Sequence, residues 1–373
     1  MKTFKINQIE YKRILGRNVR DAEKQERLAL FWGASALEVC VHAKDVWVNL
    51  SSDYSSSECW LAVEINGVQV SRFIVPKEEG WICLARNMNP QKDNLISLIK
   101  DTQAMSGDEK HSLFINGIGL DDQGSFIPLK ERKLMIEFIG DSITSGEGLC
   151  GSPDEMEWIP QWFCASKTYA RQTARALDSD WSVLSQCGWG IKWGWDGNTN
   201  SSMLCHYENV CSLMFGDYQK ALGAQEPYDF KRPADIVVVN LGTNDNGAFF
   251  QPAWKDSEGK ENQLFKDEKE IALPESGNRV KEGVKEFLAL IRKHNPSAKI
   301  VWVWGMIKLK TLPPYILKGI DEFKKEKSDS NVFALELDAM EDVEKNNEDK
   351  GSRGHPGPKT HKLAAEKLTA FLK

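Results

Sequence analysis

A serine in a glycine-rich turn is the first residue whose type and position suggest chemistry. Ser142 lies in GDSITSGEG, residues 140–148, directly after the apolar run 134–139. An apolar run that ends at glycine indicates a buried strand, and a serine on the turn after such a strand can be exposed as a nucleophile. Serine is also a common helix N-cap, so Ser142 alone decides nothing. A nucleophilic function requires a base and oxyanion donors elsewhere in the chain.

The candidate base is His355, in the segment RGHPGP at residues 353–358. A serine hydroxyl becomes a good nucleophile when a neighbouring imidazole accepts its proton. His355 precedes Pro356 in a predicted loop, so its side chain is free to point toward Ser142. His361 is the alternative base, but it falls at helical spacing within the last predicted helix, where a capping or packing role is favoured.

Candidate donors for a tetrahedral oxyanion follow two other predicted strands. Gly188, in SQCGWG, follows one strand, and Asn244, in VVVNLGTND, follows another. The backbone N–H groups of Ser142 and Gly188 and the side-chain amide of Asn244 therefore form a candidate oxyanion hole. Glycine suits position 188 because the absence of a Cβ lets the backbone and a substrate approach closely. Two alternatives stay open: Gly190 in place of Gly188, and an ordinary turn role for Asn244.

Residues 131–373 alternate between strand and helix patterns, which predicts an α/β domain with a parallel sheet covered on both faces. Ligands bind such sheets outside the carboxyl ends of the strands, so residues that follow different strands are expected to meet in one cleft. Long polar stretches at 189–215 and 246–277 are predicted to be functional loops. The predicted strands are 133–140, 181–188, 235–242, 299–306 and 331–338, and the predicted helices are 166–177, 279–294, 314–326 and 359–373.

Residues 1–130 have a different pattern, with short alternating runs and no helical periodicity. Such runs at close spacing predict a β-sandwich domain of the jelly-roll type. Asn66-Gly67 is the signal of a type I′ hairpin. The polar segment 121–133 is expected to connect the two domains. The runs are 36–43, 45–53, 60–75, 81–86, 94–102 and 112–120.

Composition argues against several classes of function. The chain has 373 residues and a formal net charge of −6, and its basic residues are scattered, so no nucleic-acid partner is expected. No apolar run approaches the roughly 18 residues that span a membrane. The eight cysteines include no CxxC pair, the histidines have no partner at metal-ligand spacing, and the N-terminal segment lacks the apolar core of a signal peptide. We therefore expect a cytoplasmic protein with reduced thiols and no metal.

The order of these residues resembles that of the SGNH (GDSL) hydrolases. An N-terminal β-sandwich ahead of such a domain is similar to carbohydrate esterase family 2, whose members remove acetyl groups from plant polysaccharides. The resemblance implies a flavodoxin-like three-layer α/β/α domain, a serine nucleophile, a histidine base and no cofactor. The matching blocks are Gly140-Asp141-Ser142-Ile143-Thr144, Gly188, Gly242-Thr243-Asn244-Asp245 and His355-Pro356.

One position departs from the family pattern. Many members carry an aspartate three residues before the histidine, where it orients the ring, and that position is Ser352 here. The nearest upstream acids are Glu348 and Asp349. The resemblance to family 2 therefore implies a Ser142–His355 dyad in which a backbone carbonyl holds the imidazole. Loss of the acid does not abolish catalysis, because the remaining geometry and the oxyanion hole persist.

Several of the thirteen tryptophans fall in loops that follow predicted strand ends. Sugars stack their apolar C–H faces on aromatic rings, whereas lipids need a continuous aliphatic groove. An aromatic rim interrupted by polar residues therefore favours carbohydrate, and we expect at least two of these rings to contact substrate; the alternative is that they fill loop cores. The candidates are Trp158, Trp162, Trp189, Trp193 and Trp195.

Together these features predict a carbohydrate O-acetylesterase that acts on acetylated oligosaccharides derived from xylan or mannan. The reaction would pass through an acetyl-enzyme on Ser142. Two other functions are compatible with the sequence. One is a lipid or thioester hydrolase on the same fold, and the other is a non-catalytic carbohydrate-binding protein that retains the fold.

Overall fold

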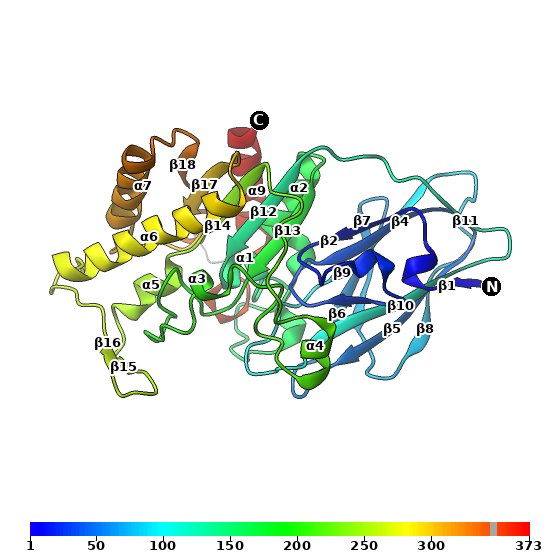
Figure 1. Ribbon diagram of the computed structural model, residues 1–373, viewed down its shortest axis with the longest axis horizontal. Helices are drawn as coiled ribbons and strands as arrows, with labels where there is room; N and C mark the ends of the chain where they lie inside the picture. Colours follow the sequence, from blue (N-terminus) through cyan, green and yellow to red (C-terminus); the bar gives the residue numbers. More distant parts are fainter. Residues whose placement is uncertain (344–348) are drawn as a thin grey trace. The chain divides into compact units, whose positions relative to one another are not determined.

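The computed structural model describes residues 1–343 and 349–373 and divides the chain into two compact units (Figure 1). The expected boundary at residue 130 lies close to Arg132, the last residue of the N-terminal segment. Two later segments, which the sequence pattern places in the α/β domain, belong to the first unit. A buried hydrogen bond of 2.6 Å from Trp32 Nε1 to the Val210 carbonyl holds one of them there. The first unit comprises Met1–Arg132, Trp158–Ser166 and Glu208–Asp229, and the second Lys133–Glu157, Lys167–Tyr207 and Phe230–Lys373.

The first unit contains two antiparallel sheets. One has the strand order β1-β10-β5-β8, with β3 also paired to β10, and the other has the order β11-β4-β9-β6-β7, with β2 also paired to β4. Side chains from both sheets, such as Val39, Leu98, Val48 and Ile115, share one hydrophobic core. The strands are β1 Lys2–Phe4, β2 Lys12–Leu15, β3 Leu28–Leu30, β4 Ala36–His42, β5 Val46–Asp53, β6 Trp60–Ile65, β7 Val68–Ile74, β8 Gly80–Ala85, β9 Asn94–Lys100, β10 Ser112–Leu120 and β11 Ser125–Ile127.

The predicted hairpin at Asn66-Gly67 is confirmed. These two residues join β6 to β7 and have φ values of 51° and 80°. Positive φ at both central positions is what a type I′ turn requires, and asparagine and glycine adopt it with little strain.

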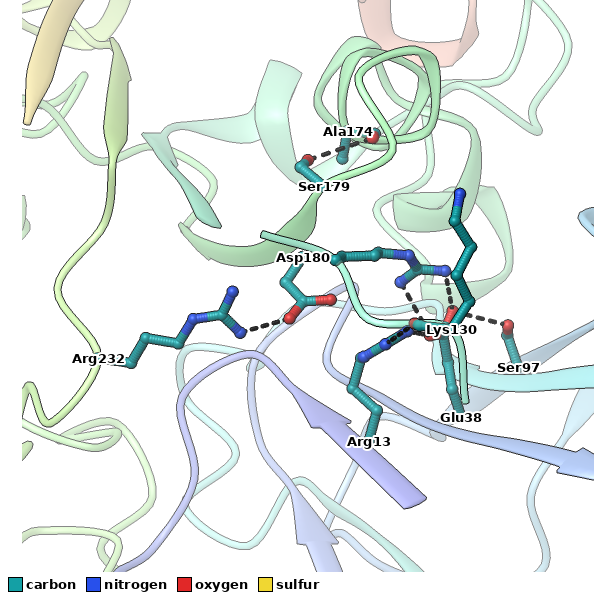
Figure 2. A network of polar contacts seen from close by, with 9 residues as sticks. Arg13, Glu38, Ser97, Lys130, Ala174, Ser179, Asp180 and Arg232 are labelled. Carbon is teal, nitrogen blue, oxygen red and sulfur yellow. Dashed lines mark hydrogen bonds and ion pairs between the residues drawn. The ribbon is translucent and has the colours of Figure 1, made fainter. Parts of the chain in front are cut away.

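The segment 121–133 is more than a connection, because β11 within it pairs with β4. Glu38 on β4 is 2% exposed and accepts hydrogen bonds from Arg13 at 3.0 Å, Arg132 at 2.8 Å and Ser97 at 3.1 Å (Figure 2). A buried carboxylate is tolerated when it is paired and hydrogen-bonded in this way. Glu38 therefore fixes the end of this segment to the sheet.

The second unit is built on a five-stranded parallel sheet with the order β13-β12-β14-β17-β18. Gly140, at the end of β12, pairs with Ser185 of β13 and Asn240 of β14. The carboxyl ends of three neighbouring strands are therefore level. The strands are β12 Met135–Gly140, β13 Asp180–Ser185, β14 Ile236–Asn240, β17 Lys299–Trp304 and β18 Val332–Glu336, and the separate pair is β15 Trp254–Lys255 with β16 Glu261–Asn262.

Helices cover both faces of this sheet (Figure 1). Phe138 of β12 packs edge-on against Tyr169, whereas Trp302 of β17 packs against Phe287. The register aligns Phe138 with Val301, so Trp302 points to the opposite face. Tyr169 belongs to α2, which packs with α9, and Phe287 belongs to α6, which packs with α7, as expected for three layers. The helices are α1 Ser142–Ser145, α2 Tyr169–Ala176, α3 Met203–His206, α4 Asp217–Leu222, α5 Thr243–Ala248, α6 Pro274–His294, α7 Pro313–Lys327, α8 Met340–Val343 and α9 Pro358–Leu372.

The four long predicted helices are present with shifted ends. Helix α6 buries Val280, Val284, Phe287 and Ile291 at helical spacing, and it begins five residues earlier than predicted, at Pro274. Proline is favoured in the first turn because its missing N–H has no partner there. Within the described part of the chain, none of the helices has the length and apolar character needed to cross a bilayer.

Candidate active site

Ser142 is the first residue of the short helix α1, directly after β12. Asp141 caps this helix, because its Oδ1 accepts the N–H of Ile143 at 3.0 Å. Gly140 allows the turn to be tight, since a Cβ at this position would lie 2.0 Å from Thr144 Oγ1. Burial raises the pKa of the Asp141 carboxyl to about 7. Gly140 and Asp141 together therefore hold Ser142 on a rigid turn.

His355 lies against Ser142 although 213 positions separate them in the sequence. Its Nε2 is 2.9 Å from Ser142 Oγ, and its Nδ1 is 3.2 Å from the carbonyl oxygen of Arg353. A carbonyl can only accept, so Nδ1 carries the hydrogen and Nε2 is left as the acceptor for the serine hydroxyl. This arrangement lets the imidazole take the proton of Ser142.

The turns that carry Ser142 and His355 are joined by their backbones. The N–H of Ser352 donates to the carbonyl of Gly148 at 3.0 Å. A Cβ at Gly148 would lie 2.4 Å from the Ser352 carbonyl oxygen, and a Cβ at Gly351 would lie 2.2 Å from the Gly148 carbonyl oxygen. Only glycine at both positions permits this close contact.

Asn244 on α5 donates from Nδ2 to the carbonyl of Trp189 at 2.7 Å and is 9% exposed. This bond fixes the orientation of the amide, and the same nitrogen keeps a second N–H. Among the described residues, the backbone N–H groups of Ser142 and Gly188 donate no hydrogen bond. These three donors come from segments that follow three neighbouring strands at the same edge of the sheet. They have the chemistry that an oxyanion hole needs.

The geometry favours Gly188 over Gly190 as the glycine donor. The N–H of Gly190 donates to the Ser201 carbonyl at 3.2 Å. A Cβ at Gly190 would lie 2.3 Å from Asp245 Oδ2, so this glycine is required by packing. Gly188 has a φ of 75°, which favours glycine.

The loop that follows Gly188 is held by Asp245. Its carboxylate accepts the backbone N–H groups of Ile191, Lys192 and Trp193 at 2.8, 3.0 and 3.2 Å. Burial raises the pKa of Asp245 to about 6. Because Asp245 is adjacent to Asn244, it connects the Asn244 turn to the Gly188 loop.

Asp349, considered as an acid that could orient His355, and His361, considered as the alternative base, both have other environments. Asp349 accepts the N–H groups of Lys359 and Thr360 at 2.7 and 2.6 Å, so it caps α9 instead of orienting His355. Glu348 lies outside the described residues. His361 is fully buried on α9, where its Nδ1 accepts the N–H of Tyr169 at 3.0 Å. Burial lowers the pKa of His361 to about 3, consistent with a packing role.

The five tryptophans considered for substrate binding differ in exposure. Trp189 and Trp193 are only 5% and 3% exposed, so little of either ring is available to stack against a sugar. This burial argues for loop packing at both positions. Trp195 is 55% exposed, and a Cβ at Gly188 would lie 2.9 Å from its Cδ1, so this ring lies beside a candidate oxyanion donor. Trp158 and Trp162 belong to the first unit.

A pocket of about 750 Å³ in the second unit is lined by polar side chains together with Trp193, Leu204 and Cys205. Asn262, Arg279 and Glu282 are among its lining residues, whereas Ser142 and His355 are not. Within the described residues, no group of three histidine, cysteine, aspartate or glutamate side chains is arranged to hold a metal ion.

Sequence reasoning missed one ionisable residue at this site. Glu147 is 4% exposed, and its Oε2 lies 3.5 Å from His355 Nε2. Its position between Gly146 and Gly148 in the nucleophile segment is the only local signal, because its partners lie more than 200 positions away.

A family model described as the GDSL-like Lipase/Acylhydrolase family matches residues 138–363. This range covers more than half of the chain and includes Ser142, Gly188, Asn244 and His355. The chain therefore belongs to the GDSL-like lipase/acylhydrolase family.

Within this family the chain is similar to family two carbohydrate esterases. The structure of an acetyl xylan esterase from the rumen bacterium Butyrivibrio proteoclasticus is 35% identical, with a TM-score of 0.94 over 100% of this chain and 98% of that chain. A family two carbohydrate esterase from Clostridium thermocellum, solved with cellohexaose, is 22% identical, with a TM-score of 0.77 over 97% and 98% of the two chains. The cellulase/esterase CelE of Acetivibrio thermocellus is 25% identical over 92% of this chain, which spans only 37% of the length of CelE.

Proposed function

We propose that this chain is a carbohydrate O-acetylesterase with Ser142 as nucleophile and His355 as base. The observation that carries the proposal is the 2.9 Å contact between Ser142 Oγ and His355 Nε2, with Nδ1 held by the Arg353 carbonyl. This is the arrangement that acyl transfer by a serine–histidine pair requires. A non-catalytic binding protein would have no need of it.

In the proposed reaction, Ser142 Oγ attacks the acetyl carbonyl while its proton moves to His355 Nε2. The resulting oxyanion is bound by the N–H groups of Ser142 and Gly188 and by Asn244 Nδ2. His355 gives its proton to the ester oxygen of the sugar as the bond from that oxygen to the acetyl carbon breaks. The sugar departs with a free hydroxyl, and the acetyl group stays on Ser142. The imidazole then takes a proton from water as the water oxygen attacks the acetyl carbonyl. It gives that proton to Ser142 Oγ as the bond between Oγ and the acetyl group breaks, which releases acetate and restores the serine hydroxyl. No residue in this sequence of steps requires a metal or cofactor.

The names of the relatives support an acetylated carbohydrate as substrate, and the exposed ring of Trp195 beside Gly188 supports stacking against a sugar. We infer that the substrates are acetylated oligosaccharides derived from xylan or mannan.

The resemblance to family two carbohydrate esterases also supports a flavodoxin-like order for the parallel sheet of the second unit and a jelly-roll topology for the first unit.

The test is acetate release from acetylated xylan and mannan oligosaccharides by the wild-type chain and by Ser142→Ala and His355→Ala. Wild-type release that both substitutions abolish is the expected result. Preference for nitrophenyl esters with long acyl chains over the acetate ester would instead favour a lipid hydrolase. Binding of these oligosaccharides without acetate release would favour the non-catalytic alternative.

A further inference from the structure

A buried carboxylate that the proposed reaction does not use lies beside its base. Glu147 Oε2 is 3.5 Å from His355 Nε2, and its Oε1 accepts a hydrogen bond from Arg353 Nε at 2.8 Å. The Glu147 side chain is only 5% exposed. A charge at this depth costs free energy unless it is paired, so the contacts of Glu147 with Arg353 and His355 are what offset the cost of burying its carboxylate.

Arg353 connects this carboxylate to the other side of the imidazole. Its backbone has a φ of 57°, in the left-handed region that non-glycine residues rarely adopt. In that conformation its carbonyl oxygen accepts a hydrogen bond from Nδ1 of His355. The N–H of Arg353 donates to the Glu155 carbonyl at 2.9 Å, and Nη1 donates to the Met156 carbonyl at 2.8 Å. These bonds and the ion pair with Glu147 hold the strained turn in place.

We propose that Glu147 is the positioning residue of His355 and takes the place of the aspartate that is absent at position 352. Its carboxylate stabilises the positive imidazole that forms when Nε2 takes the proton of Ser142. Through Arg353 it also fixes the carbonyl that holds Nδ1. The inference rests on the proposed function, because it assumes that His355 gains and loses this proton during turnover.

Among the residues that the structure describes, Arg353 and His361 are further titratable groups near the imidazole. The guanidinium of Arg353 partly neutralises Glu147, and His361 on α9 is kept neutral by burial. Removing the charge of Glu147 should therefore make His355 easier to deprotonate, whereas removing the charge of Arg353 should make it harder. A purely structural ion pair would not produce opposite effects.

The experiment measures kcat, KM and the pH profile of kcat/KM with p-nitrophenyl acetate for the wild type, Glu147→Gln, Glu147→Asp and Arg353→Met. Glu157→Gln, in an exposed position of the next loop, is the matched control. We expect Glu147→Gln to lower kcat about 10- to 100-fold with KM nearly unchanged, since one charge beside the imidazole is lost but the dyad remains. The acidic limb of the pH profile of kcat/KM should move to lower pH in Glu147→Gln and to higher pH in Arg353→Met. Glu147→Asp should recover part of kcat, and Glu157→Gln should match the wild type.

Wild-type hydrolysis that depends on Ser142 is measured first, and its absence would overturn the proposed function and this inference with it. With that activity present, an unchanged kcat and pH profile in folded Glu147→Gln would overturn the inference alone. If Glu147→Gln does not fold, Arg353→Met decides: an acidic limb that stays in place or moves to lower pH counts against the proposal.

Discussion

Replacement of Asn244 tests the candidate oxyanion hole most directly. Its Nδ2 is fixed by the 2.7 Å bond to the Trp189 carbonyl, so the second N–H of the same nitrogen is preorganised. Removal of one preorganised donor typically costs about 10²- to 10³-fold in kcat, or roughly 3–4 kcal/mol of transition-state stabilisation. We therefore expect Asn244→Ala to lower kcat by that factor and to change KM little, because the oxyanion forms only in the transition state.

The same substitution has a separate cost for the folded state. It leaves the Trp189 carbonyl without its partner, which should lower the free energy of unfolding by about 1–3 kcal/mol. Asn244→Asp has the same shape but replaces the donor with an acceptor, so it should impair kcat at least as much as Asn244→Ala.

The assay is acetate release at saturating substrate, together with denaturant unfolding of each variant. Asn246→Ala is the control, because Asn246 lies on the same helix and its Oδ1 accepts the N–H of Thr311. We expect this control to keep wild-type kcat. If Asn244→Ala keeps more than a third of wild-type kcat, or if Asn244→Asp is as active as the wild type, the oxyanion assignment is wrong.

Two other predictions concern Asp141 and Trp195. Burial raises the pKa of Asp141 from 3.8 to about 7, so the folded protein retains this proton over a pH range in which the unfolded chain has released it. The free energy of unfolding should therefore fall as pH rises through this range, by about 4 kcal/mol at roughly 1.4 kcal/mol per pH unit, and Asp141→Asn should flatten the profile. An equally steep decline in denaturant titrations of Asp141→Asn would contradict this account. Trp195→Ala should raise KM for acetylated oligosaccharides about 3- to 10-fold, as expected for loss of a stacking ring, and leave KM for p-nitrophenyl acetate unchanged. Equal changes for both substrates would show that Trp195 does not contact sugar.

The elements of both units follow from local patterns in the sequence. The run Ile236–Asn240 is fully buried as expected for a central parallel strand, and Asn66-Gly67 forms the turn that its residue types favour. The ends of helices were harder to predict, because Pro274 begins α6 before its apolar periodicity starts. Segments 158–166 and 208–229 join the first unit through long-range contacts that have no local signature.

The candidate site also contains residues that local motifs indicate and others that depend on long-range contacts. Ser142, Asn244 and His355 were identifiable because each belongs to a short motif after a strand or before a helix. Glu147 was not, since its function depends on Arg353, which is 206 positions away. The aromatic prediction failed to separate buried from open rings because Trp193 and Trp195 have the same local composition but exposures of 3% and 55%.

The backbone contact between Gly148 and Ser352 has a consequence for how such a protein can change. Because the nucleophile turn and the base turn are attached to each other, longer or shorter loops elsewhere can alter which ester is accepted while proton transfer is left undisturbed. An engineer who moves this chemistry to another scaffold should transplant both turns together, glycines included.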